Sequence, residues 1–143
     1  MPKLSKRVGE FTDSVIRRMT RISDATPGSI NLSQGFPDFD PPQVLLDALR
    51  EMAGGGEQHQ YSVTYGSENL RRCIAEKYSP IHGYEIDPET QVVVTCGGTE
   101  AMMAAMMTVC NPGDKVIVFS PFYENYGADA ILSGAEPIYV PLV

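Results

Sequence analysis

The chain has 143 residues, 43% of them hydrophobic, and its 18 Asp and Glu outnumber its 11 Lys and Arg, giving a formal net charge of −7 at pH 7. This length makes one domain or a piece of a larger one, and it is long enough to bury a core. The acidic balance, without a block of basic residues, argues against electrostatic binding to nucleic acid or to an anionic membrane. No apolar run approaches the ~20 residues of a membrane span, so we expect no membrane partner.

The N-terminus and the cysteines indicate the compartment. Residues 1–10 are polar and mixed in charge, without the apolar core of a secretory signal. Cys73, Cys96 and Cys110 are odd in number and lack the spacing of a metal site, which favours reduced thiols in a cytoplasmic protein. We interpret Cys96, beside two glycines, as a small buried residue at a strand end rather than as a reactive thiol.

The N-terminal half is predicted to consist of helices with irregular connections. Helical spacing of apolar residues, N-cap residues and glycines define the helices, and prolines restrict the loop between the first two. In chain order we expect a helix over residues 11–22, a short strand at 30–32, a loop over 34–42, a helix from Pro42 to the glycines at 54–56, and a helix from Ser67 to about Tyr78.

The C-terminal half shows a different pattern, in which strands alternate with helices. Strand–helix–strand–helix–strand order with short connections predicts a parallel sheet with right-handed crossovers. The strand at 92–94 is expected to be buried on both faces, and the helix after it is apolar nearly all round, as in the interior of a larger α/β protein. The expected elements are strands at 92–94, 116–119 and 137–140, helices over 99–109 and 124–133, and a turn at 111–114.

The stretch Val92–Ala101 is a candidate anion site. A strand ends in Gly97 and Gly98, and a helix starts on Thr99 or Glu100. Free N–H groups at a helix start favour an anion, glycines let the backbone approach it, and the Thr99 hydroxyl adds a donor. The Glu100 carboxylate would have to point away. A tight structural turn explains the glycines equally well, and the segment is neither a Walker A loop nor a dinucleotide fingerprint.

A second candidate element is the loop Ser120–Tyr123, which follows the next strand. Loops at the carboxyl ends of parallel strands line ligand crevices, and an aromatic side chain there can stack on a flat ring. The alternative is an aromatic that packs the loop onto the core. An anion site next to an aromatic surface favours a phosphorylated aromatic cofactor.

Five segments in this order resemble the N-terminal portion of class I/II aminotransferases, the fold-type-I enzymes that depend on pyridoxal 5'-phosphate. The similarity is greatest to the branch with kynurenine, aromatic and bacterial aspartate aminotransferases. The segments are LSQGFPDFDPP (Leu32–Pro42), QYSVTYGSENLR (Gln60–Arg71), VVVTCGGTEA (Val92–Ala101), NPGDKVIVFSPFYENY (Asn111–Tyr126) and GAEPIYVPL (Gly134–Leu142).

The resemblance implies roles for six residues of this chain. Gly98 and Thr99, with the N–H of Glu100, match the turn that binds the cofactor phosphate. Tyr123 matches the aromatic that stacks on the pyridine ring, and Tyr61 the tyrosine that reaches the cofactor phosphate of the neighbouring subunit. The remaining match, Gly35, is to the glycine whose backbone contacts the substrate carboxylate.

The resemblance also implies an α/β fold, the beginning of the large cofactor domain with a mostly parallel sheet in αβα layers. Residues 1–42 would be the N-terminal arm and the start of the small domain, and residues 43–143 the incomplete large domain. No lysine of the chain lies in a matching context, so the Schiff-base lysine is expected beyond Val143 and the chain alone is expected to be inactive. The complete protein would be a homodimer without a metal.

The reaction that the resemblance implies is transfer of an amino group between an amino acid and a 2-oxo acid. Two alternatives stay open at this point. One is a carbon–sulfur β-lyase of the same superfamily, which shares the cofactor turn. The other is a truncated, non-catalytic fragment that retains the folded motifs.

Overall fold

The computed structural model describes residues 3–10, 13–55 and 59–143. The chain divides into two compact units, which we treat separately. The first, here called the α/β unit, combines residues 1–35 with residues 96–143, and the second, the helical unit, comprises residues 36–95. In the described residues no helix is long and apolar enough to cross a membrane.

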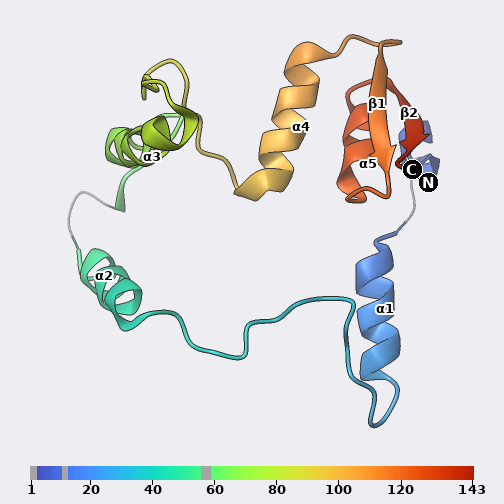
Figure 1. Ribbon diagram of the computed structural model, residues 1–143, viewed down its shortest axis with the longest axis horizontal. Helices are drawn as coiled ribbons and strands as arrows, with labels where there is room; N and C mark the ends of the chain where they lie inside the picture. Colours follow the sequence, from blue (N-terminus) through green and yellow to red (C-terminus); the bar gives the residue numbers. More distant parts are fainter. Residues whose placement is uncertain (1–2, 11–12, 56–58) are drawn as a thin grey trace. The chain divides into compact units, whose positions relative to one another are not determined.

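The centre of the α/β unit is a parallel pair of strands joined by a helix (Figure 1). Strand β1 (Lys115–Ser120) pairs with β2 (Glu136–Pro141), with Lys115 opposite Glu136 and Ser120 opposite Pro141. Helix α5 (Asn125–Leu132) connects the strands and packs on both, which leaves Ala130 fully buried. The predicted strands at 116–119 and 137–140, the helix between them and the parallel pairing are therefore confirmed.

Helix α5 contains a buried carboxyl group. The Asp129 residue is 5% exposed, and its Oδ2 has no hydrogen-bond partner among the described residues. Burial raises the pKa of this carboxyl above its ordinary value of 3.8, because removal from water penalises the charged form. Folding therefore favours the protonated acid, and stability falls as the pH rises from about 3.8 through the raised pKa.

We expect Asp129→Ala to increase the free energy of unfolding by about 1–3 kcal/mol at pH 7, the penalty for a buried polar group without a partner. The gain should shrink in acid, where Asp129 is protonated. Urea unfolding of the full chain, followed by circular dichroism between pH 4 and 8, measures both effects. The control is Asp38→Ala at an exposed loop position, which should change stability by less than ~0.5 kcal/mol. A pH-independent difference between wild type and Asp129→Ala would contradict this explanation.

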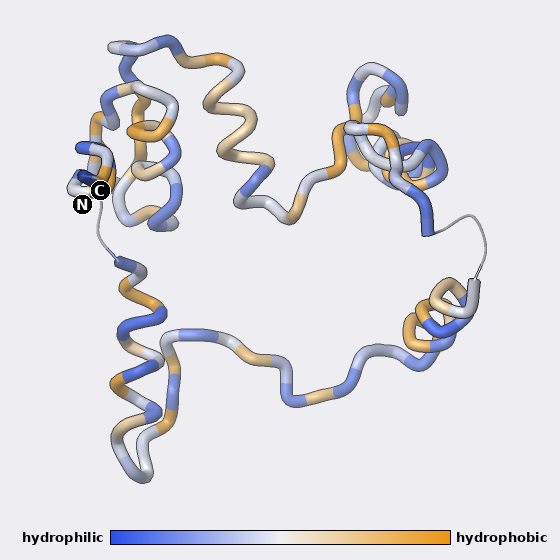
Figure 2. The backbone as a smooth tube through the Cα atoms, turned by 180° about the vertical axis from the view of Figure 1, so that it is seen from behind, coloured by the Kyte–Doolittle hydropathy of each residue, from blue (hydrophilic) through white to orange (hydrophobic). Residues whose placement is uncertain are grey.

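Helix α4 (Gly97–Val109) precedes the turn that leads into β1. Its start lies two residues before the predicted one, so Gly97 and Gly98 form its first turn rather than a linker. The helix is apolar along most of its length (Figure 2), yet none of its residues is buried, and Met107 and Val109 are 62% and 73% exposed. Helix α5 packs against α4, but most of the apolar surface that the sequence indicated stays exposed within the described chain.

The N-terminal part of the α/β unit holds a 3-10 helix η1 (Lys6–Gly9) and helix α1 (Val15–Asp24). Residues 11 and 12 of the predicted helix lie outside the described residues. The Ser14 hydroxyl caps α1 by accepting the Arg17 N–H at 3.2 Å. Residues 30–32 do not form the expected strand, since they pair with neither β1 nor β2, and Ile30 and Leu32 are 83% and 92% exposed.

The helical unit contains α2 (Gln43–Ala53) and α3 (Glu68–His82). Helix α2 begins after Pro42 and ends at Gly54, as predicted; Gly56 lies outside the described residues. The Ser67 hydroxyl accepts the Leu70 N–H at the start of α3, which confirms the predicted cap. Helix α3 runs four residues past the predicted end at Tyr78 and stops at Gly83, which has a φ of +74°.

Residues 92–94 are not a strand, which corrects the sequence prediction. Val92 is buried, but Val93 is 61% exposed, so the segment is not covered on both faces. The Val94 N–H donates to the carbonyl of Tyr65 at 2.9 Å. A strand needs a hydrogen-bonded ladder to a neighbouring strand. In the described part of the chain the paired strands are β1 and β2, and they pair only with each other.

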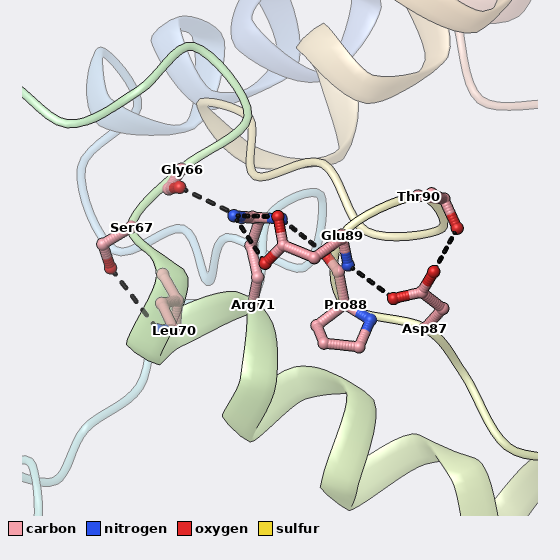
Figure 3. Close-up of polar contacts among 8 residues, drawn as sticks. All are labelled: Gly66, Ser67, Leu70, Arg71, Asp87, Pro88, Glu89 and Thr90. Carbon is pink, nitrogen blue, oxygen red and sulfur yellow. Dashed lines mark hydrogen bonds and ion pairs between the residues drawn. The ribbon is translucent and has the colours of Figure 1, made fainter.

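A buried arginine joins the start of α3 to the loop that follows it (Figure 3). The Arg71 guanidinium donates to the carbonyls of Gly66 and Pro88 at 3.2 and 2.5 Å and to both carboxylate oxygens of Glu89 at 3.2 Å. The side chain of Arg71 is 5% exposed. In the same loop, hydrogen bonds from the Thr90 hydroxyl and then the Glu89 N–H lower the pKa of the exposed Asp87 carboxyl.

Candidate functional site

Four segments of the α/β unit surround a broad cavity of about 1280 Å³. They are the segment from η1 into α1, residues 33–35, the first turn of α4, and the loop from β1 into α5 with the facing part of β2. Three residues with sequence-predicted roles, Gly35, Thr99 and Tyr123, line this one cavity. The lining residues are Val8, Glu10, Asp13, Ser14, Val15, Ile16, Arg17, Ser33, Gln34, Gly35, Thr99, Phe122, Tyr123, Glu124, Asn125, Ala128 and Tyr139.

The first turn of α4 contains two glycines with different backbone conformations. Gly97 has a φ of +79°, a left-handed conformation that favours glycine, and it turns the chain into the helix. Gly98 has no such φ, and beyond its chain neighbours and the backbone of its own helix an added Cβ there would meet no atom within 4 Å. The side of Gly98 on which a Cβ would stand is therefore open, and the N–H groups of Gly98 and Thr99 in the first turn lack acceptors within the helix.

The Glu100 carboxylate does not point away from this turn, which corrects the expectation from sequence. Its Oε2 accepts a hydrogen bond from the backbone N–H of Cys96, the residue before the helix. A carboxylate at the positive end of the helix dipole stabilises the helix start. Cys96 itself is exposed and precedes a helix, so it is not the buried strand-end residue that the sequence indicated.

A side-chain hydrogen bond links the α4 turn to the start of α5. The Asn125 Nδ2 donates to the Thr99 Oγ1 at 3.2 Å, and both residues line the cavity. Sequence reasoning assigned no role to Asn125. In the sequence Asn125 is only an amide residue at the start of a helix that follows a candidate ligand loop. The local pattern does not distinguish it from an ordinary helix start.

The aromatic residues of the loop after β1 have different surroundings. The Phe122 ring stacks on Tyr139 of β2, with centroids 4.9 Å apart and an interplanar angle of 18°. Tyr123 contacts Tyr126 edge-on at 5.9 Å and remains 48% exposed. Tyr123 also borders a second, apolar cavity of about 450 Å³ together with Met102 and other residues of α4 and β1. Of the two loop aromatics, Tyr123 thus has more of its surface available to a ligand.

Carboxylates position the first turn of α1 at the cavity. The Glu124 Oε2 accepts the Val15 N–H at 3.0 Å, which ties α1 to the loop that carries Tyr123. The Asp13 carboxylate accepts the Ser14 N–H at 3.0 Å and pairs with Arg21 at 2.8 Å. The hydrogen bond from Arg21, followed by that from the Ser14 N–H, lowers the pKa of Asp13, so this carboxylate stays charged at neutral pH.

Tyr61 lies in the helical unit and is fully exposed, at 102% of the reference area for the residue. No described residue covers this ring. The assignment of Tyr61 to a neighbouring subunit's cofactor, like the roles of Gly35, Gly98, Thr99, Glu100 and Tyr123, stays a prediction. In the described residues no group of three or more His, Cys, Asp and Glu is arranged to hold a metal ion.

Comparison with known proteins identifies the family. The model of the family "Aminotransferase class I and II" matches residues 27–143. The chain belongs to this aminotransferase family. The predicted family and its α/β fold with a parallel sheet are therefore confirmed, and the fold is shared with solved aminotransferases.

Curated relatives match almost the whole chain. It is 39% identical over 137 residues to the probable N-succinyldiaminopimelate aminotransferase DapC of Mycobacterium tuberculosis, which covers 96% of this chain and 34% of that protein. It is 32% identical to kynurenine–oxoglutarate transaminase 3 of Rattus norvegicus, over 98% of this chain and 31% of the relative. The solved M. tuberculosis N-succinyldiaminopimelate aminotransferase superposes with a TM-score of 0.87, at 38% identity, covering 99% of this chain and 36% of that structure. The chain thus spans about a third of the length of these relatives.

Proposed function

We propose that the protein containing this chain is a pyridoxal 5'-phosphate-dependent aminotransferase, which moves an amino group between an amino acid and a 2-oxo acid. The observation that carries the proposal is the cavity that Gly35, Thr99 and Tyr123 line together in a chain of this family. When bound, pyridoxal phosphate supplies an electron-withdrawing ring that carries the amino group between the two substrates.

The donors of this chain suit that cofactor by their chemistry, and phosphate binding would require the Glu100 carboxylate to leave the Cys96 N–H. The N–H groups of Gly98, Thr99 and Glu100, with the Thr99 hydroxyl, would bind the phosphate at the positive end of α4. The Tyr123 ring would stack on the pyridine, and the Gly35 backbone would contact the substrate carboxylate. The open space at Gly98 supports a close approach of the phosphate to the backbone.

The chain's own groups would bind and orient rather than move protons. The lysine that reacts with the cofactor would come from outside this sequence, beyond Val143. We propose a cytoplasmic homodimer, with residues 1–42 as arm and start of the small domain and residues 43–143 as the beginning of the large domain. The proposed boundary at residue 42 concerns the domains of the complete fold. The division of this chain into two compact units, with boundaries after residues 35 and 95, reflects packing within the chain itself.

The test is a spectroscopic and kinetic one on the full-length protein. Added pyridoxal phosphate should give a visible absorption band, and an amino acid with a 2-oxo acid should give the exchanged pair at equal rates. Release of thiol, ammonia and pyruvate from S-substituted cysteine without any need for a 2-oxo acid would instead identify a β-lyase. Absence of turnover with bound cofactor would identify a non-catalytic protein.

We expect Tyr61→Phe to weaken cofactor binding by about 1.5–3 kcal/mol in the full-length dimer, through loss of one hydrogen bond to a charged phosphate. The loss should occur in trans. In a mixed dimer of a Tyr61→Phe chain and a Gly98→Val chain, the one intact phosphate turn receives its tyrosine from the Gly98→Val chain. That site should keep wild-type affinity in equilibrium dialysis. Affinity as weak as in the Tyr61→Phe homodimer would contradict the cross-subunit role, and Tyr65→Phe in the same segment is the matched control.

A further inference from the structure

The contact between Asn125 and Thr99 joins two separate parts of the candidate site. Thr99 lies in the first turn of α4 and Asn125 is the first residue of α5, 26 positions later. Their side chains meet at 3.2 Å at the wall of the cavity that Tyr123 and Gly35 also line. The contact therefore fixes the anion turn relative to the aromatic loop.

The direction of this hydrogen bond determines where the Thr99 proton can go. The Asn125 Nδ2 is a donor only, so the Thr99 oxygen accepts in this contact. A hydroxyl group can accept a hydrogen bond and also donate its own proton. The Thr99 hydroxyl cannot donate to the Asn125 amide nitrogen, which is itself a donor. The Thr99 proton is thus free to point to another acceptor, and a phosphate offers only acceptors at neutral pH.

The start of α5 holds Asn125 in place for this task. The Tyr126 N–H donates to the Tyr123 carbonyl at 3.1 Å, which closes the turn around Asn125. Glu124 lies between Tyr123 and Asn125 in the sequence, and its carboxylate accepts a hydrogen bond from the Val15 N–H of α1. Asn125 is half-buried as a residue, and its contact with Thr99 lies at the exposed wall of the cavity.

We propose that Asn125 is a positioning residue for cofactor binding: its amide orients the Thr99 hydroxyl so that the hydroxyl proton is donated to the cofactor phosphate. This inference rests on the proposed function. It adds a residue that the sequence pattern did not indicate. It also predicts an effect on the phosphate end of the cofactor and none on the ring.

The experiment is a double-mutant cycle in the full-length protein with the variants Asn125→Ala, Thr99→Ala and both. Dissociation constants are measured for pyridoxal phosphate and for pyridoxal, which lacks the phosphate. Asn125→Ala should weaken pyridoxal phosphate about threefold to tenfold, as expected for one neutral hydrogen bond, and leave pyridoxal unchanged. In the Thr99→Ala background the same substitution should have an effect below about twofold.

A merely structural role would give another result. Equal losses in both backgrounds, an equal loss for pyridoxal, or wild-type affinity in Asn125→Ala each overturn the inference. Asn125→Asp, which keeps the shape and suits a helix start, should weaken binding more than Asn125→Ala, because its carboxylate accepts the Thr99 proton. Asn69→Ala on the exposed surface of α3 is the matched control. If the wild type itself does not bind pyridoxal phosphate, the proposed function is wrong and the inference falls with it.

Discussion

Gly98→Val should lower the affinity of the full-length protein for pyridoxal phosphate by more than about 100-fold while its secondary structure stays intact. Within this chain a Cβ at Gly98 meets no atom within 4 Å beyond its neighbours and its own helix backbone, and the residue has no left-handed φ. We therefore expect the valine to act on what binds against the turn rather than on the turn itself. Overpacking by ~1–3 kcal/mol, together with loss of a charge-assisted hydrogen bond worth ~1.5–3 kcal/mol, gives a loss of this size.

The neighbouring glycine provides the contrast. Gly97→Val places a β-branched residue at a φ of +79° and should strain the turn itself, so it should lower stability as well as affinity. Equilibrium dialysis measures the affinity of each variant, and far-ultraviolet circular dichroism with thermal unfolding measures the fold. If folded Gly98→Val binds pyridoxal phosphate like wild type, the first turn of α4 is only a structural turn and the cofactor site is assigned wrongly.

Arg71→Met should reduce the free energy of unfolding of the helical unit by about 1–3 kcal/mol, the usual cost of leaving hydrogen-bond acceptors without their donor, because the Glu89 side chain is 61% exposed and can return to water. Methionine replaces the aliphatic stem but none of the donors. The carbonyls of Gly66 and Pro88 and the Glu89 carboxylate then lose their shared partner. Because these groups come from both sides of α3, the loop after the helix should lose its attachment first (Figure 3).

The next residue along the helix is a matched control for this prediction. Arg72 is 56% exposed in its side chain and lies 3.9 Å from Glu76, a surface pair that contributes little. Arg72→Met should therefore change stability by less than ~0.5 kcal/mol. Urea unfolding, monitored by helical circular dichroism and by hydrogen exchange of residues 86–91, compares the two variants. Equal effects of the two substitutions would show that the buried cluster does not stabilise the unit.

Local sequence patterns were sufficient for elements whose determinants lie within the element or its neighbours. The Ser67 cap, the glycines after α2, and the alternation of β1, α5 and β2 are such cases, and they appear as predicted. The strands expected at 30–32 and 92–94 failed for one reason. Apolar, β-branched composition shows that a segment suits a sheet, but the ladder depends on a partner strand that the local pattern does not contain.

The same distinction between local and long-range determinants applies to the candidate site. The glycine turn and the aromatic loop have motifs, so Thr99 and Tyr123 could be proposed from sequence, and they line one cavity with Gly35. Side-chain directions could not be predicted in this way. The Asn125 amide meets Thr99 because α4 and α5 pack against each other, whereas the Glu100 carboxylate returns to the Cys96 N–H within the start of α4 itself.

The α/β unit is discontinuous in sequence, since about 60 residues separate Gly35 from Cys96. Bringing these two ends together restricts the unfolded chain, and for a flexible connection of this length the loop-closure entropy amounts to roughly 3–4 kcal/mol. An ordered insertion has fewer conformations to lose than a flexible one. The described residues that line the 1280 Å³ cavity all belong to the α/β unit. A stably folded helical unit, held in part by the hydrogen bonds of Arg71, thus reduces the entropy that is lost when the two parts of the α/β unit come together to form this cavity.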